Sequence, residues 1–407
     1  MRKEIKYTAW SGLGVLLYIF LYYGLKLSEP VSWVMRITIL LILYKYSSKV
    51  INIKQIDKTG FIILFFFILW QIISFIRGSF DAENNYWIWK NMTNNLLVTF
   101  FYIFILYATN PIWTSTFYKL QWKYFIILLA VAILLCKNPI MINYLPYTTM
   151  FLFWPSIPKR CKISLLLIAL YFFIFNTQRN DIAKILFATF CGLIVYKCYK
   201  MIPSSVIKVS HLILLTAPFL FILLAVYTNF NIFNFNEYIS GNHKVTRVEN
   251  GETIEEDLLA DTRTFIFKNT FYTLNKYDKW IIGRNTAHGD EGFSSFIDTK
   301  TGTRGRYGNE VGILNILLWH GLIGVLLYYC LYARASYLAI YRSKNVYMKI
   351  IGIYTSFLWC WSFIWERCLF EMFYLMNIIF IGICLSKTFR NMTNLEFSNW
   401  IRTIYKK

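Results

Sequence analysis

Apolar residues occur in long blocks along the chain, and short segments rich in Lys and Arg separate these blocks. The blocks show no alternation of the kind that marks membrane β-strands, so each block predicts a helix. Their length, roughly 13 to 21 residues, is close to what a bilayer core about 30 Å thick requires. The pattern therefore predicts an all-α, polytopic membrane helix bundle.

Twelve blocks are candidate membrane spans, and they define three regions of the chain. The spans lie at residues 10–27, 31–46, 60–76, 94–108, 124–136, 140–154, 163–176, 182–196, 209–227, 311–331, 350–364 and 369–385. The fifth and sixth lie near Pro139 and Pro146 and are also compatible with broken or re-entrant helices. We expect residues 1–227 to carry nine spans, residues 228–308 to form one large loop outside the cytoplasm, and residues 309–407 to carry three spans and a tail.

Composition supports a membrane protein and excludes several other classes. The chain is 57% apolar and only 15% charged, whereas soluble domains are about 25% charged. The net charge of +21 lies mainly in short segments that flank the spans, so we do not expect nucleic acid as a partner. The eight Cys lie in or beside apolar blocks, without a CxxC pair, and the four His are scattered, so neither a disulfide framework nor a metal or other cofactor site is expected.

The distribution of basic residues predicts the orientation of the chain. Twenty-four Lys and Arg lie in the N-terminal segment and the alternate segments that follow it, whereas the short segments between hold about seven. By the positive-inside rule, both termini are expected in the cytoplasm and residues 228–308 outside it. The apolar run from Trp10 to Leu27 has no small-residue cleavage site after it and is expected to be the first membrane anchor.

The large loop differs in composition from the rest of the chain, because it holds eleven of the 21 acidic residues. Leu258, Leu259, Phe265 and Ile266 recur at helical spacing, which predicts an amphipathic helix at 254–275 lying over the bundle. The segment from Gly283 to Gly308 is rich in Gly, Thr, Arg and Asp, and predicts an irregular loop that leads into the tenth span.

Five arginines of the outer segments are candidates for binding an anionic lipid headgroup, because planar guanidinium groups bind phosphate oxygens in pairs. They are Arg179, Arg263, Arg284, Arg304 and Arg306. Arg179 lies in a short outer turn, against the positive-inside trend, although a snorkelling side chain explains it equally well. For each of the others, a solvated or salt-bridged loop residue is the alternative.

Glu310 is the candidate catalytic base, since it stands where the apolar run of the tenth span begins. The alternative is an acidic residue that stabilises a helix N-terminus. His288, with Asp290 and Glu291, forms a second candidate cluster, and its composition also suits a surface turn. His320 is expected to be a packing histidine. Glu366 and Arg367 are expected either to line the cavity or to cap a helix.

Two stretches resemble the O-antigen polymerase and ligase superfamily of bacterial membrane enzymes. The first is Phe175-Asn-Thr-Gln-Arg-Asn-Asp181, which is similar to an Arg-containing turn of that family. The second runs from Arg263 through Trp280-Ile-Ile-Gly283 to the segment from Gly308 to Gly324. The resemblance implies a metal-independent membrane glycosyltransferase of the GT-C kind, in which Arg179 binds the lipid pyrophosphate.

Ligases of this family usually carry a His-Asn pair where this chain has Asn309-Glu310, and the departure favours a polymerase. The expected activity is the polymerisation of undecaprenyl-diphosphate-linked repeat units into O-antigen or capsule-like polysaccharide at the outer face of the bacterial inner membrane. The expected partners are the lipid-linked glycan, the lipid bilayer and a chain-length regulator protein. The alternatives are an O-antigen ligase and a flippase or transporter of lipid-linked sugars.

Overall fold

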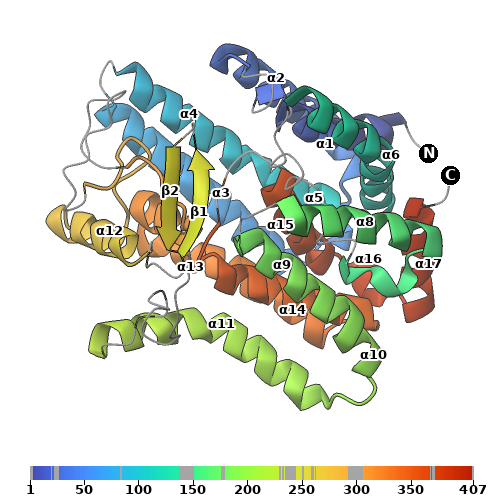
Figure 1. The fold of residues 1–407 in the computed structure, drawn as a ribbon. Coiled ribbons are helices and arrows are strands. Elements are labelled where there is room, and N and C mark those ends of the chain that lie inside the picture. Colours follow the sequence, from blue (N-terminus) through green and yellow to red (C-terminus); the bar gives the residue numbers. More distant parts are fainter. Residues whose placement is uncertain are drawn as a thin grey trace.

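The computed structural model describes most of the chain as a helical bundle (Figure 1). The described residues are 3–19, 21–22, 27–82, 85–136, 151–175, 179–228, 231, 233, 244–249, 252–257, 261, 263–291, 306–366, 368 and 372–405. Within these ranges the regular elements are helices, apart from one two-stranded antiparallel hairpin. The fold class expected from the sequence is thus confirmed as predominantly helical.

The helices follow the chain in the order of the apolar blocks. The N-terminal half holds α1 (Lys3–Ile19), α2 (Glu29–Val50), α3 (Lys58–Asp81), α4 (Tyr86–Phe101), α5 (Ile103–Ala108), α6 (Pro111–Cys136), α8 (Lys159–Phe175), α9 (Arg179–Phe190), α10 (Tyr196–Cys198) and α11 (Ser204–Tyr227). The hairpin β1 (Lys244–Glu249) and β2 (Glu252–Asp257) and helix α12 (Thr264–Lys276) come next. The last part holds α13 (Gly312–Tyr341), α14 (Val346–Trp361), α15 (Met372–Leu385), α16 (Lys387–Asn391) and α17 (Asn394–Tyr405).

Four of the described helices are long and apolar enough to cross a membrane. They are Lys58–Asp81, the continuous pair Tyr86–Ala108, Ser204–Tyr227 and Gly312–Tyr341. A membrane-type bundle is therefore confirmed. The number of twelve spans stays a prediction, and most of the predicted span 140–154 lies outside the described residues.

Helix α13 is the central element, and α11 lies at the edge of the bundle (Figure 1). In the apolar part of α13, 61% of the residues are buried, against 17% in α11. Helices α3, α14 and α15 pack against α13, and buried rings fill the contact, as where Phe67 of α3 lies 5.6 Å from the ring of Tyr328. The exposed apolar side chains of α11, among them Leu220 and Leu223, provide a surface suited to lipid.

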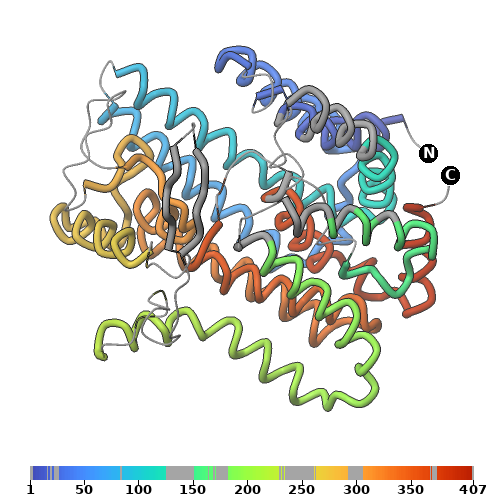
Figure 2. Tube along the Cα trace, in the orientation of Figure 1, coloured from blue at the N-terminus to red at the C-terminus, as the bar shows by residue number. Residues whose placement is uncertain are grey.

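The two chain termini lie at the same end of the bundle, and α12 lies at the opposite end (Figure 2). Near the termini, Arg334 donates two hydrogen bonds of 2.9 Å to Asp57, which also caps the start of α3. Trp400 of α17 donates to the carbonyl of Pro111 at 2.9 Å. The side of the membrane on which the termini lie stays a prediction.

The predicted helix at 254–275 is wrong at its start, because residues 252–257 form a strand and the helix begins at Thr264. In the hairpin, Arg247 pairs with Ile254 and Val245 pairs with Glu256. Each strand contains two adjacent β-branched residues, Val245-Thr246 and Thr253-Ile254, and such residues favour an extended chain. The carboxylate of Asp261 then accepts the backbone N–H of Thr264 at 2.9 Å, and so fixes where the helix starts.

Candidate functional site

Helix α12 is anchored over the end of the bundle through the residues at its N-terminus. Asp261 accepts the backbone N–H groups of Arg263 and Thr264 at 3.0 and 2.9 Å, and the side-chain amide of Asn231 at 2.7 Å. Burial on its own would raise the pKa of the Asp261 carboxyl, but the hydrogen bonds from Thr264, Arg263 and Asn231 bring it below its usual value. The start of α12 is therefore held by an ionised carboxylate.

The structure brings together two of the predicted site residues, Arg263 and Glu310. Nη2 of Arg263 lies 3.0 Å from Oε2 of Glu310, and the exposed fractions of the two side chains are 18% and 38%. Glu310 stands just before α13, and its carbonyl oxygen accepts the backbone N–H of Glu366 at 3.1 Å. The pair is thus fixed through its backbone and yet reachable by a ligand through its carboxylate.

An apolar cavity of about 450 Å³ lies beside this pair, between the end of α11, α12 and the turn after α14. Its apolar wall includes Phe221 and Ile222 of α11, Phe267 and Phe271 of α12, and Phe363 and Ile364. Its polar edge is formed by Thr228, Asn231, Thr264 and Lys268. Lys268 lines the cavity, whereas Arg263 and Glu310 do not; Arg263 is the residue just before Thr264, which does. Arg263, Lys268 and Glu310 are here called the cavity rim.

A buried ion pair lies on the other side of Glu310. Nζ of Lys184 is 2.8 Å from Oε2 of Glu366, and the two side chains are 0% and 3% exposed. Asn377 donates to the same carboxylate oxygen at 3.2 Å, and the ammonium group of Lys184 lies 4.9 Å from the centre of the Trp365 ring. Lys184 was missed by sequence reasoning, although an ionisable residue inside the apolar run 182–196 was a signal for it.

Three of the predicted arginines are only partly described or not described. Arg179 is the first residue of α9, and its side chain lies outside the described part of the structure. Because Lys184 follows five residues later, the backbone of Arg179 lies about 7.5 Å further along the helix axis. Arg304 and Arg367 lie outside the described residues altogether.

Arg284 is buried and holds together the outer loop segment, residues 277–291. Nη2 lies 3.1 Å from Oε1 of Glu291, Nη1 donates to the carbonyl of Gly289 at 3.1 Å, and the guanidinium lies 3.7 Å from the centre of the Tyr277 ring. Glu291 also accepts from Lys276 at 2.8 Å. Burial acts against ionisation of Glu291, but hydrogen bonds from Lys276 and Tyr277 and the charge of Arg284 lower its pKa to about 2. The guanidinium of Arg284 is thus already engaged within the segment.

His288 belongs to the same segment and faces α3. Its Nε2 lies 3.5 Å from Oδ2 of Asp81, and its carbonyl accepts the indole N–H of Trp319 at 3.0 Å. Burial and the nearby charge of Arg284 lower the pKa of the His288 imidazole. His288 is therefore placed to hold the segment against the bundle rather than at the cavity rim.

Arg306 lies next to the first turn of α12. Its guanidinium is 5.2 Å from the centre of the Phe265 ring, and its backbone exchanges two hydrogen bonds with Asp290, at 2.7 and 2.9 Å. Burial raises the pKa of the Asp290 carboxyl. Arg306 is exposed, and its side chain lies against Phe265, two residues after Arg263.

A break in α13 binds the outer loop segment to the bundle. Gly321 has φ 65° and ψ −168° inside the helix, and Gly283 has φ 71°. Across the break, Leu322 and Ile323 donate to the carbonyls of Trp280 and Ile281 at 2.8 and 3.2 Å. In return, the N–H groups of Arg284 and Asn285 donate to the carbonyls of Leu318 and Trp319 at 2.7 and 3.2 Å. The loop segment thus satisfies the backbone groups that the break exposes.

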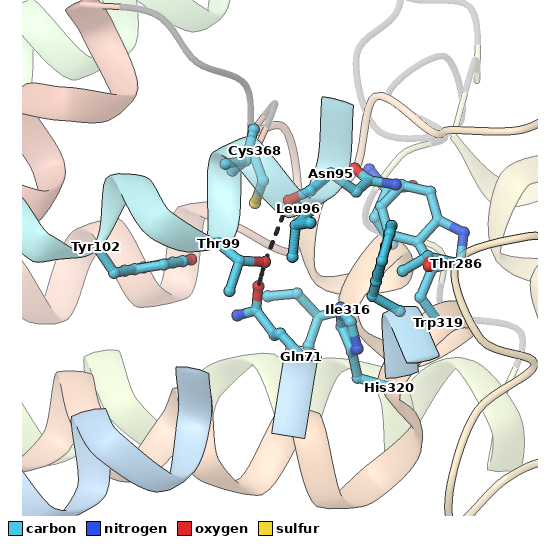
Figure 3. Close-up of a pocket in the computed structure, with 13 residues that line it drawn as sticks. Gln71, Asn95, Leu96, Thr99, Tyr102, Thr286, Ile316, Trp319, His320 and Cys368 are labelled. Atoms are coloured by element: carbon cyan, nitrogen blue, oxygen red, sulfur yellow. Dashed lines mark hydrogen bonds between the residues drawn. The ribbon is translucent and has the colours of Figure 1, made fainter. Parts of the chain in front are cut away.

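A small cavity of about 30 Å³ with polar and apolar lining residues lies under this break, between α3, α4 and α13 (Figure 3). Gln71 accepts from Thr99 at 2.7 Å on one side, and His320 faces them from α13. Nδ1 of His320 and Oγ1 of Thr286 are buried and have no hydrogen-bond partner among the described residues. The cavity has room for water but not for a larger ligand.

Within the described residues, no group of three or more His, Cys, Asp and Glu is arranged to hold a metal ion. Comparisons of the chain with family models, with characterised proteins and with solved structures found no match.

Proposed function

We propose that this chain polymerises oligosaccharide repeat units carried on undecaprenyl diphosphate at the outer face of a bacterial inner membrane. One observation carries the proposal: the ion pair of Arg263 and Glu310 is formed by the residue next to Thr264, and Thr264 and Lys268 line an apolar cavity. A polyprenyl diphosphate has the matching chemistry, because an apolar chain is joined to a dianionic headgroup. The cavity volume lies within the usual range for ligand sites, about 300–1,000 Å³.

The donor lipid is held in two parts. The portion of its chain next to the headgroup lies against Phe267, Phe271 and Phe363, and the rest extends into the bilayer beside α11. The diphosphate lies at the rim, where Arg263 and Lys268 supply positive charge. Arg179 binds it from the start of α9, as the resemblance to polymerases suggests.

In the reaction, the hydroxyl oxygen of the acceptor sugar bonds to the anomeric carbon of the donor glycan. The bond between that carbon and the diphosphate oxygen breaks, and undecaprenyl diphosphate leaves with the bonding electron pair. Glu310 takes the hydroxyl proton. In the resting state Arg263 is paired with Glu310 at 3.0 Å. The diphosphate of an arriving donor competes with Glu310 for Arg263. Donor binding therefore releases the Glu310 carboxylate, which can then take the proton of the acceptor hydroxyl.

The test is elongation of a synthetic polyprenyl-diphosphate oligosaccharide by the purified protein in nanodiscs, with products measured by mass spectrometry. The wild type is expected to form chains of several repeat units, while R179A, R263A and E310Q lower the rate by about 100-fold, equivalent to about 2.7 kcal/mol. R263K recovers little, because an ammonium group lacks the planar donors of Arg. The control is K279Q, whose side chain is exposed on the same outer segment.

Three results would contradict the proposal. If E310Q and R263A elongate the donor at the wild-type rate, Glu310 and Arg263 take no part in the reaction. Transfer of glycan only to an acceptor without a lipid diphosphate would identify a ligase. A wild type that moves lipid-linked sugars between leaflets of a vesicle without lengthening them would identify a transporter.

A further inference from the structure

The ion pair of Lys184 and Glu366 is enclosed within the helical bundle. Both charged groups are withdrawn from water, with exposures of 0% and 3%. Removing two charges from water costs several kcal/mol for each, and apolar residues of similar size usually serve stability as well or better. Ionisable residues within membrane-type helices are therefore functional candidates, and this pair lies close to the cavity rim.

On one side the pair is connected to Glu310. The backbone N–H of Glu366 donates to the carbonyl of Glu310 at 3.1 Å, and Ile313 donates to the carbonyl of Ser362 at 3.2 Å. The contact at Gly312 is so close that a Cβ there would lie 2.5 Å from the carbonyl oxygen of Glu366. The backbone of Glu366 is thus fixed against the residues that carry the candidate base.

On the other side the pair is connected to the first turns of α9. Lys184 is the only link of α9 to Glu366 that the described residues show as an ion pair, and its ammonium group also lies over the ring of Trp365. Arg179 begins the same helix, about 7.5 Å from Lys184 along the axis. One ion pair and one peptide hydrogen bond therefore connect the start of α9 to Glu310.

The turn that carries Glu366 also borders the cavity, since Phe363 and Ile364 line it. Residues 362–366 hence contact three parts that the proposed reaction needs: the lipid cavity, the backbone of Glu310 and the helix that begins with Arg179. From this geometry we infer that Lys184 and Glu366 are positioning residues. Their ion pair sets the distance between Arg179, which holds the diphosphate, and Glu310, which receives the acceptor proton. The inference rests on the proposed function.

The experiment is a double-mutant cycle with K184M, E366Q and K184M/E366Q, measured for thermal stability and for donor kcat and KM in nanodiscs. Each single variant leaves one buried charge without its partner and is expected to unfold at a lower temperature. The double variant is neutral, Met keeps the bulk of Lys, and Gln keeps an acceptor for Asn377. Its Tm is expected to return to within a few degrees of the wild type.

The kinetic constants of the double variant separate positioning from packing. A positioning pair predicts that kcat stays about 30-fold below the wild type while the donor KM changes less than 3-fold, although stability has returned. A pair that serves packing alone predicts that kcat recovers together with Tm, and that result would overturn the inference. The matched control is D57N/R334M, which neutralises the ion pair at the opposite end of the bundle and is expected to keep wild-type kcat.

Failure of the proposed function gives a different result from failure of the inference. If the wild type elongates no donor, the proposed function is wrong. Amide hydrogen exchange of residues 182–190 in the same variants then tests whether the ion pair fixes α9. Exchange in α9 about tenfold faster in K184M/E366Q than in the wild type supports fixation of this helix by the pair. Equal exchange rates contradict it.

Discussion

The cavity rim and the outer loop segment both contain an arginine paired with a glutamate, but the two pairs differ in their surroundings. In the loop segment, Arg284 is 7% exposed, bonded to Glu291 and Gly289 and stacked on Tyr277. At the rim, Arg263 faces Glu310, whose side chain is 38% exposed. The first pair is enclosed by its own segment, while the second stands at the edge of a cavity.

The difference shows that positive charge alone does not identify a binding site. A guanidinium whose neighbours already supply an anion, a carbonyl and a ring gains little from a phosphate and would lose all three contacts. Arg263 pairs with a carboxylate that is 38% exposed, so another anion can compete with that carboxylate at the surface. Under the proposed function, this difference in exposure separates Arg284, which stabilises its segment, from Arg263, which binds the diphosphate.

The largest expected effect concerns the break that holds the loop segment, and the variant is G321A. A Cβ at this position would lie 2.2 Å from the carbonyl oxygen of Ile281, and φ of 65° is unfavourable for alanine. We expect a loss of about 4 kcal/mol of stability, seen as a low yield of folded protein and a lower Tm. The control is G308A, where an added Cβ meets only an ordinary contact of 3.8 Å. Equal Tm values for the two variants would contradict the interlocked break.

The next effect compares the two arginines directly, in R284M and R263M. R284M leaves Glu291 without a buried cation and removes the contact with Tyr277, so we expect a loss of about 2 to 3 kcal/mol in thermal unfolding. R263M leaves a half-exposed carboxylate and should cost less than about 1 kcal/mol. The opposite order of stability would mean that the two pairs have been assigned the wrong roles.

The last prediction concerns how the stability contributed by the outer loop segment depends on pH. The pKa of Glu291 is about 2 in the folded protein, against a usual value of 4.5, so its ionisation stabilises the fold fully above pH 4.5. This stabilisation is lost as the pH falls toward 2. E291Q should therefore have a lower Tm than the wild type at pH 7, and the difference should shrink between pH 4.5 and 2. An exposed acid in the same segment provides the control, D278N, which should follow the wild-type profile.

The helices were predictable from sequence because their signal is local. Apolar length alone indicated the segments that became α3, α11 and α13, and the turn into α13 placed Glu310 correctly at its start. The hairpin was missed, although Asn250-Gly251 between two segments with β-branched residues is a strong turn signal. Leu258, Leu259, Phe265 and Ile266 recur at helical spacing, which predicted a helix that starts too early.

The pairing of charges was less predictable, because it depends on contacts between distant residues. Arg263 and Glu310 were each selected for their own position, but 47 residues separate them and nothing local indicates their contact. Arg284 was predicted to be one of the headgroup-binding arginines. Its burial could not be predicted, because it depends on how Tyr277 and Glu291 fold back around it. Lys184 had a local signal, and only its partner Glu366 had to come from the structure.

The break at Gly321 divides α13 into a short segment before it and a longer one after it. The nine residues from Gly312 to His320 are hydrogen-bonded to the outer loop segment and to Trp70 and Ser74 of α3. Every residue of this short segment is buried, whereas the longer remainder of the helix has exposed positions such as Leu322 and Leu326. The part of α13 that follows Glu310 is therefore held by the outer loop segment and α3, and not only by the rest of its own helix.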